Sequence, residues 1–202
     1  MVDERVAAVI ARLRAEDTEQ RRQGLPSEQR TRNLDEETAR YLYLLVRAVR
    51  PAQIVEVGSS NGLSTIWLAL AAREYGGRVT GTEIVPERAA AANDNLATAG
   101  LADVARVVAG DAREIVAGLP GPFDFVFLDA EKDEYSAHFD VFFPKVRPDG
   151  LIVTDNVISH DCTAFQAMLR ARDDVETVTL PLERGLEFTV KTSRQTADGR
   201  RQ

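Results

Sequence analysis

The 202-residue sequence contains a single cysteine, Cys162, which excludes an intrachain disulfide and a zinc cluster built from several cysteines. Positively charged residues are also fewer than negatively charged ones: the chain has 25 Lys and Arg residues and 32 Asp and Glu residues, which give a net charge of −7. A general nucleic-acid binder needs a basic face, so we expect no nucleic-acid partner. No apolar run approaches the length that spans a bilayer, and the charged N-terminal segment has no signal-peptide core. We therefore expect a cytoplasmic protein with no membrane partner.

Two amphipathic helices are predicted at the N-terminal end, over residues 2–15 and 34–50. The first should bury its apolar stripe against the domain or against a second subunit, because a lone helix of this length is marginal in water. A polar connector over residues 18–33, broken by Gly24 and Pro26, separates the two helices. The positions predicted to face inward are Val6, Val9, Ile10 and Leu13 in the first helix, and Leu42, Leu45, Val46 and Val49 in the second.

Strands and helices alternate after Pro51, which predicts an α/β fold with a mostly parallel sheet and helices on both faces. The strands are expected at 54–57, 78–83, 104–109, 123–128 and 151–154, and the helices at 63–73, 86–99, 112–117, 133–143 and 163–172. Residues 175–181 and 186–191 are typical of an antiparallel hairpin. We expect one domain over residues 1–192, with N-terminal helices over 1–50, an α/β core over 51–192 and a disordered polar tail over 193–202.

The stretch IVEVGSSNGLSTIWLAL, residues 54–70, is typical of a strand, a tight turn and a helix that together hold a nucleotide cofactor. A dinucleotide fingerprint needs a second glycine where Ser60 stands, so the turn is not built for phosphates. S-adenosylmethionine (SAM) has no phosphate, and its amino-acid end suits a carboxylate, small residues and hydroxyl groups. These groups are supplied by Glu56, Gly58, Ser59 and Ser64. A plain strand–helix turn remains an alternative, because short glycine motifs are weak signals.

Polar residues follow the next two predicted strands, where ligands bind in such sheets. Glu83 ends the second strand and could accept hydrogen bonds from both ribose hydroxyls of NAD or SAM. Gly110, Asp111 and Ala112 follow the third strand and could flank an adenine. The alternatives are a solvated Glu83 and a helix-capping Asp111, and capping is compatible with adenine binding.

Asp129, Asp155 and Asn156 follow the fourth and fifth strands and should emerge on one side of the sheet. Two carboxylates and an amide oxygen form an all-oxygen set that suits Mg²⁺, and Mn²⁺ or Ca²⁺ could also fit. Lys132 lies three residues after Asp129 and could lean over the same site. Taken singly, each aspartate could instead be a helix cap and Lys132 a solvated amine.

The motifs EVGSSNGLSTIWLA, TEIVPERAAAANDN, GDA, LDAEKDEY and DNV resemble, in this order, the small cation-dependent O-methyltransferases related to catechol and caffeoyl-CoA O-methyltransferases. The resemblance spans about residues 34–191 and implies a Rossmann-like class I methyltransferase fold with a seven-stranded sheet, and often a homodimer. It implies Asp129, Asp155 and Asn156 as metal ligands and Lys132 as catalytic base. The residues implied around SAM are Leu34, Glu56, Gly58, Ser59, Ser64, Glu83, Gly110, Asp111, Ala112 and Asp129.

The chain departs from this family where the methyl acceptor should bind. Arg32 and Asn33 stand near the methionine end of the cofactor, and VISHDC, with His160 and Cys162, replaces the usual sequence after the metal pair. The expected acceptor is a small molecule with adjacent hydroxyls, such as a catechol, because chelation of both hydroxyls lowers the pKa of one. A non-catalytic or metal-independent SAM-binding protein remains an alternative, and an NAD-dependent enzyme is a more remote one.

Overall fold

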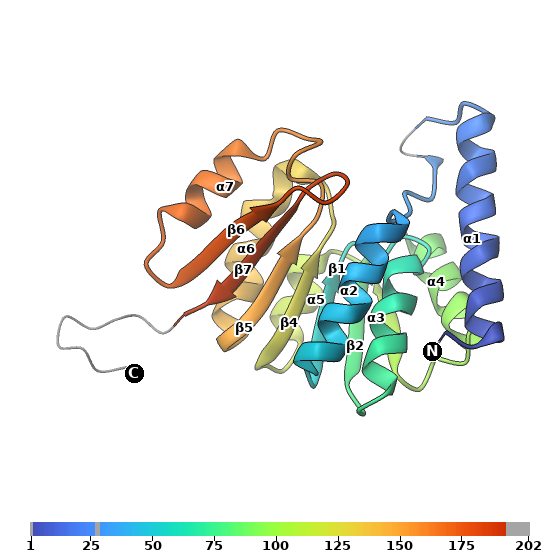
Figure 1. The fold of residues 1–202 in the computed structure, drawn as a ribbon, viewed down its shortest axis with the longest axis horizontal. Coiled ribbons are helices and arrows are strands. Elements are labelled where there is room, and N and C mark those ends of the chain that lie inside the picture. Colours follow the sequence, from blue (N-terminus) through green and yellow to red (C-terminus); the bar gives the residue numbers. More distant parts are fainter. Residues whose placement is uncertain (1, 27–28, 193–202) are drawn as a thin grey trace.

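The computed structural model describes residues 2–26 and 29–192 and has a seven-stranded sheet in the order β3-β2-β1-β4-β5-β7-β6 (Figure 1). The expected polar tail, 193–202, lies outside the described residues. The strands are β1 (Gln53–Val57), β2 (Arg78–Glu83), β3 (Ala105–Ala109), β4 (Phe123–Leu128), β5 (Val146–Thr154), β6 (Val175–Leu180) and β7 (Leu186–Lys191). β1 to β5 pair in parallel, and β7 joins β5 and β6 in antiparallel pairs. The predicted Rossmann-like fold with a terminal hairpin is confirmed.

Helices cover both faces of this sheet. They are α1 (Glu4–Arg22), α2 (Glu36–Val49), α3 (Leu63–Arg73), α4 (Pro86–Thr98), α5 (Ala112–Gly118), α6 (Tyr135–Phe142) and α7 (Thr163–Arg170), with 3₁₀ turns at Lys132–Glu134 and Phe143–Lys145. Alternation along β1 separates the two layers: Ile54 packs with α1 to α4, whereas Val55 packs with α5 to α7. Near-continuous apolar strands such as β4 are explained by this burial on both sides.

The N-terminal helix packs against the outer side of the first layer, next to α3 and α4 (Figure 1). The four apolar side chains predicted to line its inner face are all buried there, so the expected stripe is confirmed within one chain. The helix continues to Arg22, and the connector predicted from residue 18 was wrong over this last turn. Pairs such as Arg21–Asp17, 2.9 Å apart, extend the helix without apolar periodicity.

Smaller corrections concern element ends. Val49, predicted to face inward, is 37 % exposed because it occupies the last position of α2. β5 begins at Val146, not at 151, since its first residues continue the pairing with Phe123 of β4. The helix predicted over 133–143 starts with a 3₁₀ turn that carries Lys132. Among the described residues, no helix is both long and apolar enough to cross a membrane.

Candidate active site

A cavity of about 750 Å³ opens at the carboxyl ends of the parallel strands. Its wall is formed by the segments that follow β1, β2, β3, β4 and β5, by the connector before α2, and by the β6–β7 turn. Open α/β sheets bind ligands at this edge. Most of the predicted site residues line this cavity: Leu34, Gly58, Ser59, Ser64, Glu83, Gly110, Asp111, Ala112, Asp129, Lys132, Asp155 and Asn156.

The turn after β1 is fixed by hydrogen bonds to β2. The backbone N–H groups of Gly58 and Ser59 both donate to the carbonyl oxygen of Thr82, at 3.1 and 2.9 Å. Gly58 has a φ of +91°, and a Cβ atom placed on it would lie 2.3 Å from the carbonyl oxygen of Asp129. A glycine is therefore required here by both backbone conformation and space.

Glu56 is the predicted cofactor residue that does not line the cavity. Its side chain is fully buried behind the turn, where it accepts hydrogen bonds from the hydroxyls of Ser59, at 2.6 Å, and Thr65. Burial raises the pKa of Glu56 to about 7 although these hydroxyls oppose the rise. In this structure Glu56 holds the turn from behind through one carboxylate oxygen, and its Oε1 has no hydrogen-bond partner among the described residues, so a contact with the cofactor stays a prediction. The sequence does not reveal this, because the alternation of residues along a strand predicts which face of the sheet a side chain lies on but not how deeply that side chain is buried.

Glu83 lies at the end of β2 with little exposure and lines the cavity. Its two carboxylate oxygens accept hydrogen bonds from the backbone N–H groups of Ser60, at 2.8 Å, and Val85, at 3.0 Å. Because each oxygen can accept more than one hydrogen bond, Glu83 keeps acceptor capacity for a ligand hydroxyl. Its position is compatible with the predicted ribose contact.

Asp111 acts as the N-cap of α5, as the capping alternative predicts. It accepts a hydrogen bond from the Arg113 N–H at 2.8 Å and is 2.7 Å from the Arg113 guanidinium. These hydrogen bonds lower the pKa of Asp111 to about 2. Gly110 donates its N–H to the Glu83 carbonyl at 2.9 Å and lines the cavity together with Ala112. The adenine contact remains a prediction beside this cap.

Asp129 and Asp155 converge because β4 and β5 are neighbours. Each follows directly after one member of the register pair Leu128 and Thr154, and the Asp155 N–H donates to the Leu128 carbonyl at 3.0 Å. Asp155 is only 2 % exposed, and its Oδ1 has no hydrogen-bond partner among the described residues. Burial, together with the charge of Asp129, raises the pKa of Asp155 to about 8. The side-chain amide of Asn156 contacts the other oxygen of Asp155.

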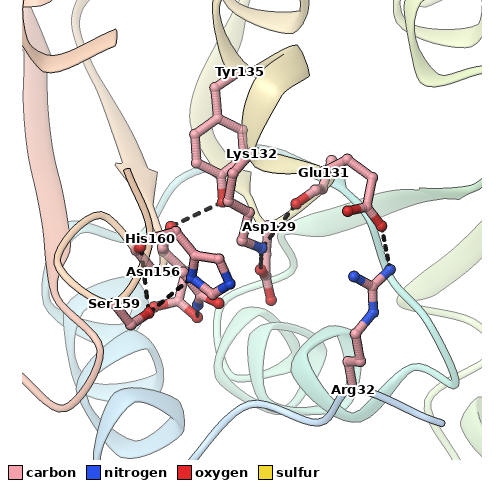
Figure 2. A network of polar contacts seen from close by, with 10 residues as sticks. Arg32, Asp129, Glu131, Lys132, Tyr135, Asn156, Ser159 and His160 are labelled. Carbon is pink, nitrogen blue, oxygen red and sulfur yellow. Dashed lines mark hydrogen bonds and ion pairs between the residues drawn. The ribbon is translucent and has the colours of Figure 1, made fainter. Parts of the chain in front are cut away.

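Lys132 completes this group of polar side chains (Figure 2). Its Nζ lies 2.9 Å from Oδ1 of Asp129 and donates a hydrogen bond to the Ala130 carbonyl at 2.8 Å. The phenol of Tyr135 donates a hydrogen bond to the Asp155 carbonyl at 2.8 Å, so a buried aromatic side chain holds the end of β5 in place. Tyr135 is a packing residue of the second layer, and Trp67 is one of the opposite layer.

The buried pair of carboxylates fits a divalent cation. The Oδ1 of Asp155 that lacks a partner and the raised pKa values of both aspartates indicate negative charge that the described residues compensate only in part. Among the described residues, no group of three or more His, Cys, Asp or Glu side chains could hold a metal ion. The predicted set has two carboxylates and one amide, so a cation would need further ligands from water or substrate.

Several cavity residues are not among the predicted site residues. Arg32, on the connector before α2, pairs with Glu131 of the segment after β4, so the ion pair joins two segments that line the cavity (Figure 2). Asn61 is buried beside the turn with no hydrogen-bond partner for its amide among the described residues. His160 lines the cavity, whereas Cys162 is buried in the second layer. The sequence placed Arg32 near the cofactor, but it gave no signal of the ion pair with Glu131, which lies 99 positions away.

Comparison with known proteins agrees with this geometry. Residues 55–157, about half of the chain, match the family model described as a methyltransferase domain, and the chain belongs to this family. A catechol O-methyltransferase from Mycobacterium tuberculosis is 41 % identical over 120 residues, which cover 59 % of this chain and 54 % of that protein. A probable caffeoyl-CoA O-methyltransferase 3 from Dictyostelium discoideum is 27 % identical over 154 residues, 65 % of this chain and 61 % of that protein. The chain thus spans little more than half the length of the curated relatives it matches.

The structural comparison extends over nearly the whole chain. The O-methyltransferase TomG from Streptomyces achromogenes, solved in complex with SAM and involved in tomaymycin synthesis, has a TM-score of 0.76 and 27 % identity. The match covers 94 % of this chain and 90 % of that one. The resemblance to catechol and caffeoyl-CoA O-methyltransferases drawn from the motifs is confirmed.

Proposed function

We propose that the protein transfers the methyl group of SAM to one hydroxyl of a vicinal diol, with a divalent cation as cofactor. The observation that carries this proposal is the convergence of the buried Asp129 and Asp155, with Lys132 at 2.9 Å from Asp129, in the same cavity as the turn after β1. An NAD-dependent enzyme is disfavoured by Ser60, which stands where a dinucleotide fingerprint has glycine. The named relatives and the SAM complex of TomG support the methyl donor.

The cofactor half of the site is assigned to the turn and to β2. SAM, when bound, supplies a methyl group on a positively charged sulfur. Glu83 would accept hydrogen bonds from the ribose hydroxyls, and Gly58, which also lines the cavity, would lie beside the ligand as part of the turn. Leu34, which is buried at the cavity wall, would cover the methionine end.

The acceptor half is assigned to the strand ends of β4 and β5. Asp129, Asp155 and Asn156 would hold a cation, which is expected to be Mg²⁺, with Mn²⁺ or Ca²⁺ as alternatives. A divalent cation at these residues would supply positive charge that lowers the pKa of a hydroxyl nearby. Lys132 in its neutral form would take that proton on Nζ. The oxygen would then form a bond to the methyl carbon as the carbon–sulfur bond breaks and its electron pair stays on sulfur.

Three assays test this proposal. In the first, SAM with an isotopically labelled methyl group and catechol are incubated with the protein and Mg²⁺, and the product is identified by mass spectrometry. We expect monomethylated catechol that carries the label and formation of S-adenosylhomocysteine (SAH). In the second, calorimetry should show SAM or SAH binding and no NAD binding. NAD binding without a response to SAM would overturn the proposal. The third assay, light scattering, would test the homodimer that the resemblance implies.

A further inference from the structure

The cavity wall has a composition that a neutral aromatic acceptor does not explain. Among the described lining residues there is no Phe, Tyr or Trp, although aromatic and apolar side chains usually dominate small-molecule sites. Six arginines line the cavity: Arg21, Arg30, Arg32, Arg88, Arg113 and Arg184. The same wall also carries Lys132 and nine acidic side chains, so these arginines matter through their individual pairing and not through an excess of positive charge.

Three of these arginines are held by acidic neighbours. Arg21 pairs with Asp17, Arg32 with Glu131, and Arg113 with Asp111, and Arg88 also interacts with a neighbour. Arg30 and Arg184 line the same cavity without an ion pair to any residue that the structure describes, and the Nε of Arg30 is buried without a partner there. A cation in a partly buried position gains most from an anionic ligand when no protein carboxylate already pairs with it.

Arg184 is placed on the acceptor side by the backbone. The N–H groups of Ile158 and Ser159 both donate to the Arg184 carbonyl at 3.0 Å, and the Val157 N–H donates to the Gly185 carbonyl at 3.1 Å. These bonds fasten the β6–β7 turn to the segment that follows Asn156.

His160 belongs to the same segment. Its Nδ1 lies 2.9 Å from the Ser159 hydroxyl, and this hydroxyl also donates to the Asn156 carbonyl at 3.4 Å (Figure 2). Arg184 lines the same cavity as Asp129 and Asn156.

We propose that the methyl acceptor carries an anionic group, a carboxylate or a phosphate-like group, next to its vicinal hydroxyls, and that Arg184 binds this group. The proposal rests on the proposed function and narrows its substrate class. The planar guanidinium can donate two parallel hydrogen bonds to a carboxylate or phosphate. His160, on the adjoining segment, and Arg30, on the connector, line the same cavity. The diol would then be held at one end by the strand-end oxygens and at the other by Arg184.

The test compares three diols of similar size: 3,4-dihydroxybenzoate, (3,4-dihydroxyphenyl)phosphonate and the neutral methyl 3,4-dihydroxybenzoate. We expect the wild-type protein to prefer one or both anions over the ester by about tenfold or more in kcat/KM, mainly through KM, as for a hydrogen bond to a charged group. Comparison of the carboxylate with the phosphonate shows which of the two anionic groups the protein prefers. Arg184→Gln should abolish the preference and Arg184→Lys should retain part of it. Arg106→Gln, which removes an exposed arginine of β3 outside the cavity, should leave it unchanged.

Two results would overturn this inference. One is the absence of any preference for the anions in the wild-type protein. The other is an equal loss of kcat/KM for the acid and the ester in Arg184→Gln, which would mean that Arg184 only balances the charge of the two aspartates. Calorimetry of the same diols with the protein, SAH and Mg²⁺ gives a second measure of the preference for anions, as binding affinity. If none of the diols is methylated, the proposed function fails, and the calorimetric preference still decides whether Arg184 binds anions.

Discussion

Gly58 and Asp129 contact each other through their backbones: a Cβ on Gly58 would lie 2.3 Å from the carbonyl oxygen of Asp129. Gly58 belongs to the turn after β1, and Asp129 to the strand end assigned to the cation. The two strands are also joined by the Asp129 N–H, which donates to the Val57 carbonyl at 2.9 Å. The two segments to which we assign the cofactor and the acceptor are therefore held at a fixed separation, which methyl transfer between two bound molecules requires.

Gly58→Ala should disrupt both halves at once. The new Cβ would overlap backbone atoms that cannot rotate away, so we expect a destabilisation of at least about 3 kcal/mol and loss of SAH binding. Gly76→Ala is the matched control, since Gly76 has a similar φ of +83° but nothing within 4 Å of the added Cβ. It should cost about 1–2 kcal/mol. Denaturant unfolding measures the stability of both variants and calorimetry measures their SAH binding. Equal effects of the two substitutions would contradict the importance of the contact between Gly58 and Asp129.

Lys132 is predicted to act as the proton acceptor. Lys132→Ala should lower turnover by about 10²–10⁴-fold, the range for a general base, while SAH binding is largely kept. Lys132→Arg keeps a positive charge near Asp129 but cannot give up its proton at ordinary pH, so it should be as inactive as the alanine variant. Single-turnover rates measure both variants. Recovery of turnover in Lys132→Arg would show that the charge is needed and the base is not.

Glu56 should make the stability of the protein depend on pH. Its pKa rises from 4.5 to about 7 in the folded state because of burial. The neutral form is thus favoured by folding, and the stability gained below pH 4.5 is lost as the pH rises towards 7. This rise corresponds to about 3 kcal/mol.

The pH dependence of unfolding with EDTA present tests this effect. Glu56→Gln should make the loss of stability between pH 4.5 and 7 smaller, while the loss caused by the raised pKa of Asp155 remains. Glu176→Gln, at an exposed position on β6, should leave the curve as in the wild-type protein. Identical curves for wild type and Glu56→Gln would mean that another group causes the loss.

The N-terminal helix is predicted to stabilise the whole domain. Leu13 is 1 % exposed and packs in the layer that contains α3 and α4, so Leu13→Ala should cost about 2–5 kcal/mol. Leu44→Ala, at a position of α2 that is 63 % exposed, should change stability by no more than about 0.5 kcal/mol. Thermal unfolding distinguishes the two, and a neutral Leu13→Ala would show that α1 folds independently of the domain.

The strand ends were the most predictable part of the site. Asp129 and Asp155 follow apolar strands of near-continuous hydrophobicity, and parallel neighbours end at one edge, so their convergence follows from the sequence. The boundaries of β2, β4, α3 and β7 agree with the predicted ranges for the same reason, because turn residues flank strong periodic runs.

Side-chain depth and long-range ion pairs were less predictable. Glu56 and Ser59 lie three residues apart, yet the sequence does not tell that the hydroxyl of Ser59 donates to the Glu56 carboxylate instead of facing a ligand. Arg32 and Glu131 are 99 positions apart, and only the folded connector brings them together. The last turn of α1 was missed because charged pairs, and not apolar residues, extend it.

The central claim is that the protein methylates a diol with the help of a cation held at Asp129, Asp155 and Asn156. The most direct measurement is the initial rate of methyl transfer from SAM to 3,4-dihydroxybenzoate and its methyl ester, in excess EDTA and after Mg²⁺ is restored. We predict that the wild-type protein turns over with Mg²⁺ and that its rate is at least a hundredfold lower in EDTA. The Asp155→Asn variant should still bind SAH but show no turnover after Mg²⁺ is restored. Equal rates with and without EDTA, or a fully active Asp155→Asn variant, would contradict the cation-dependent account.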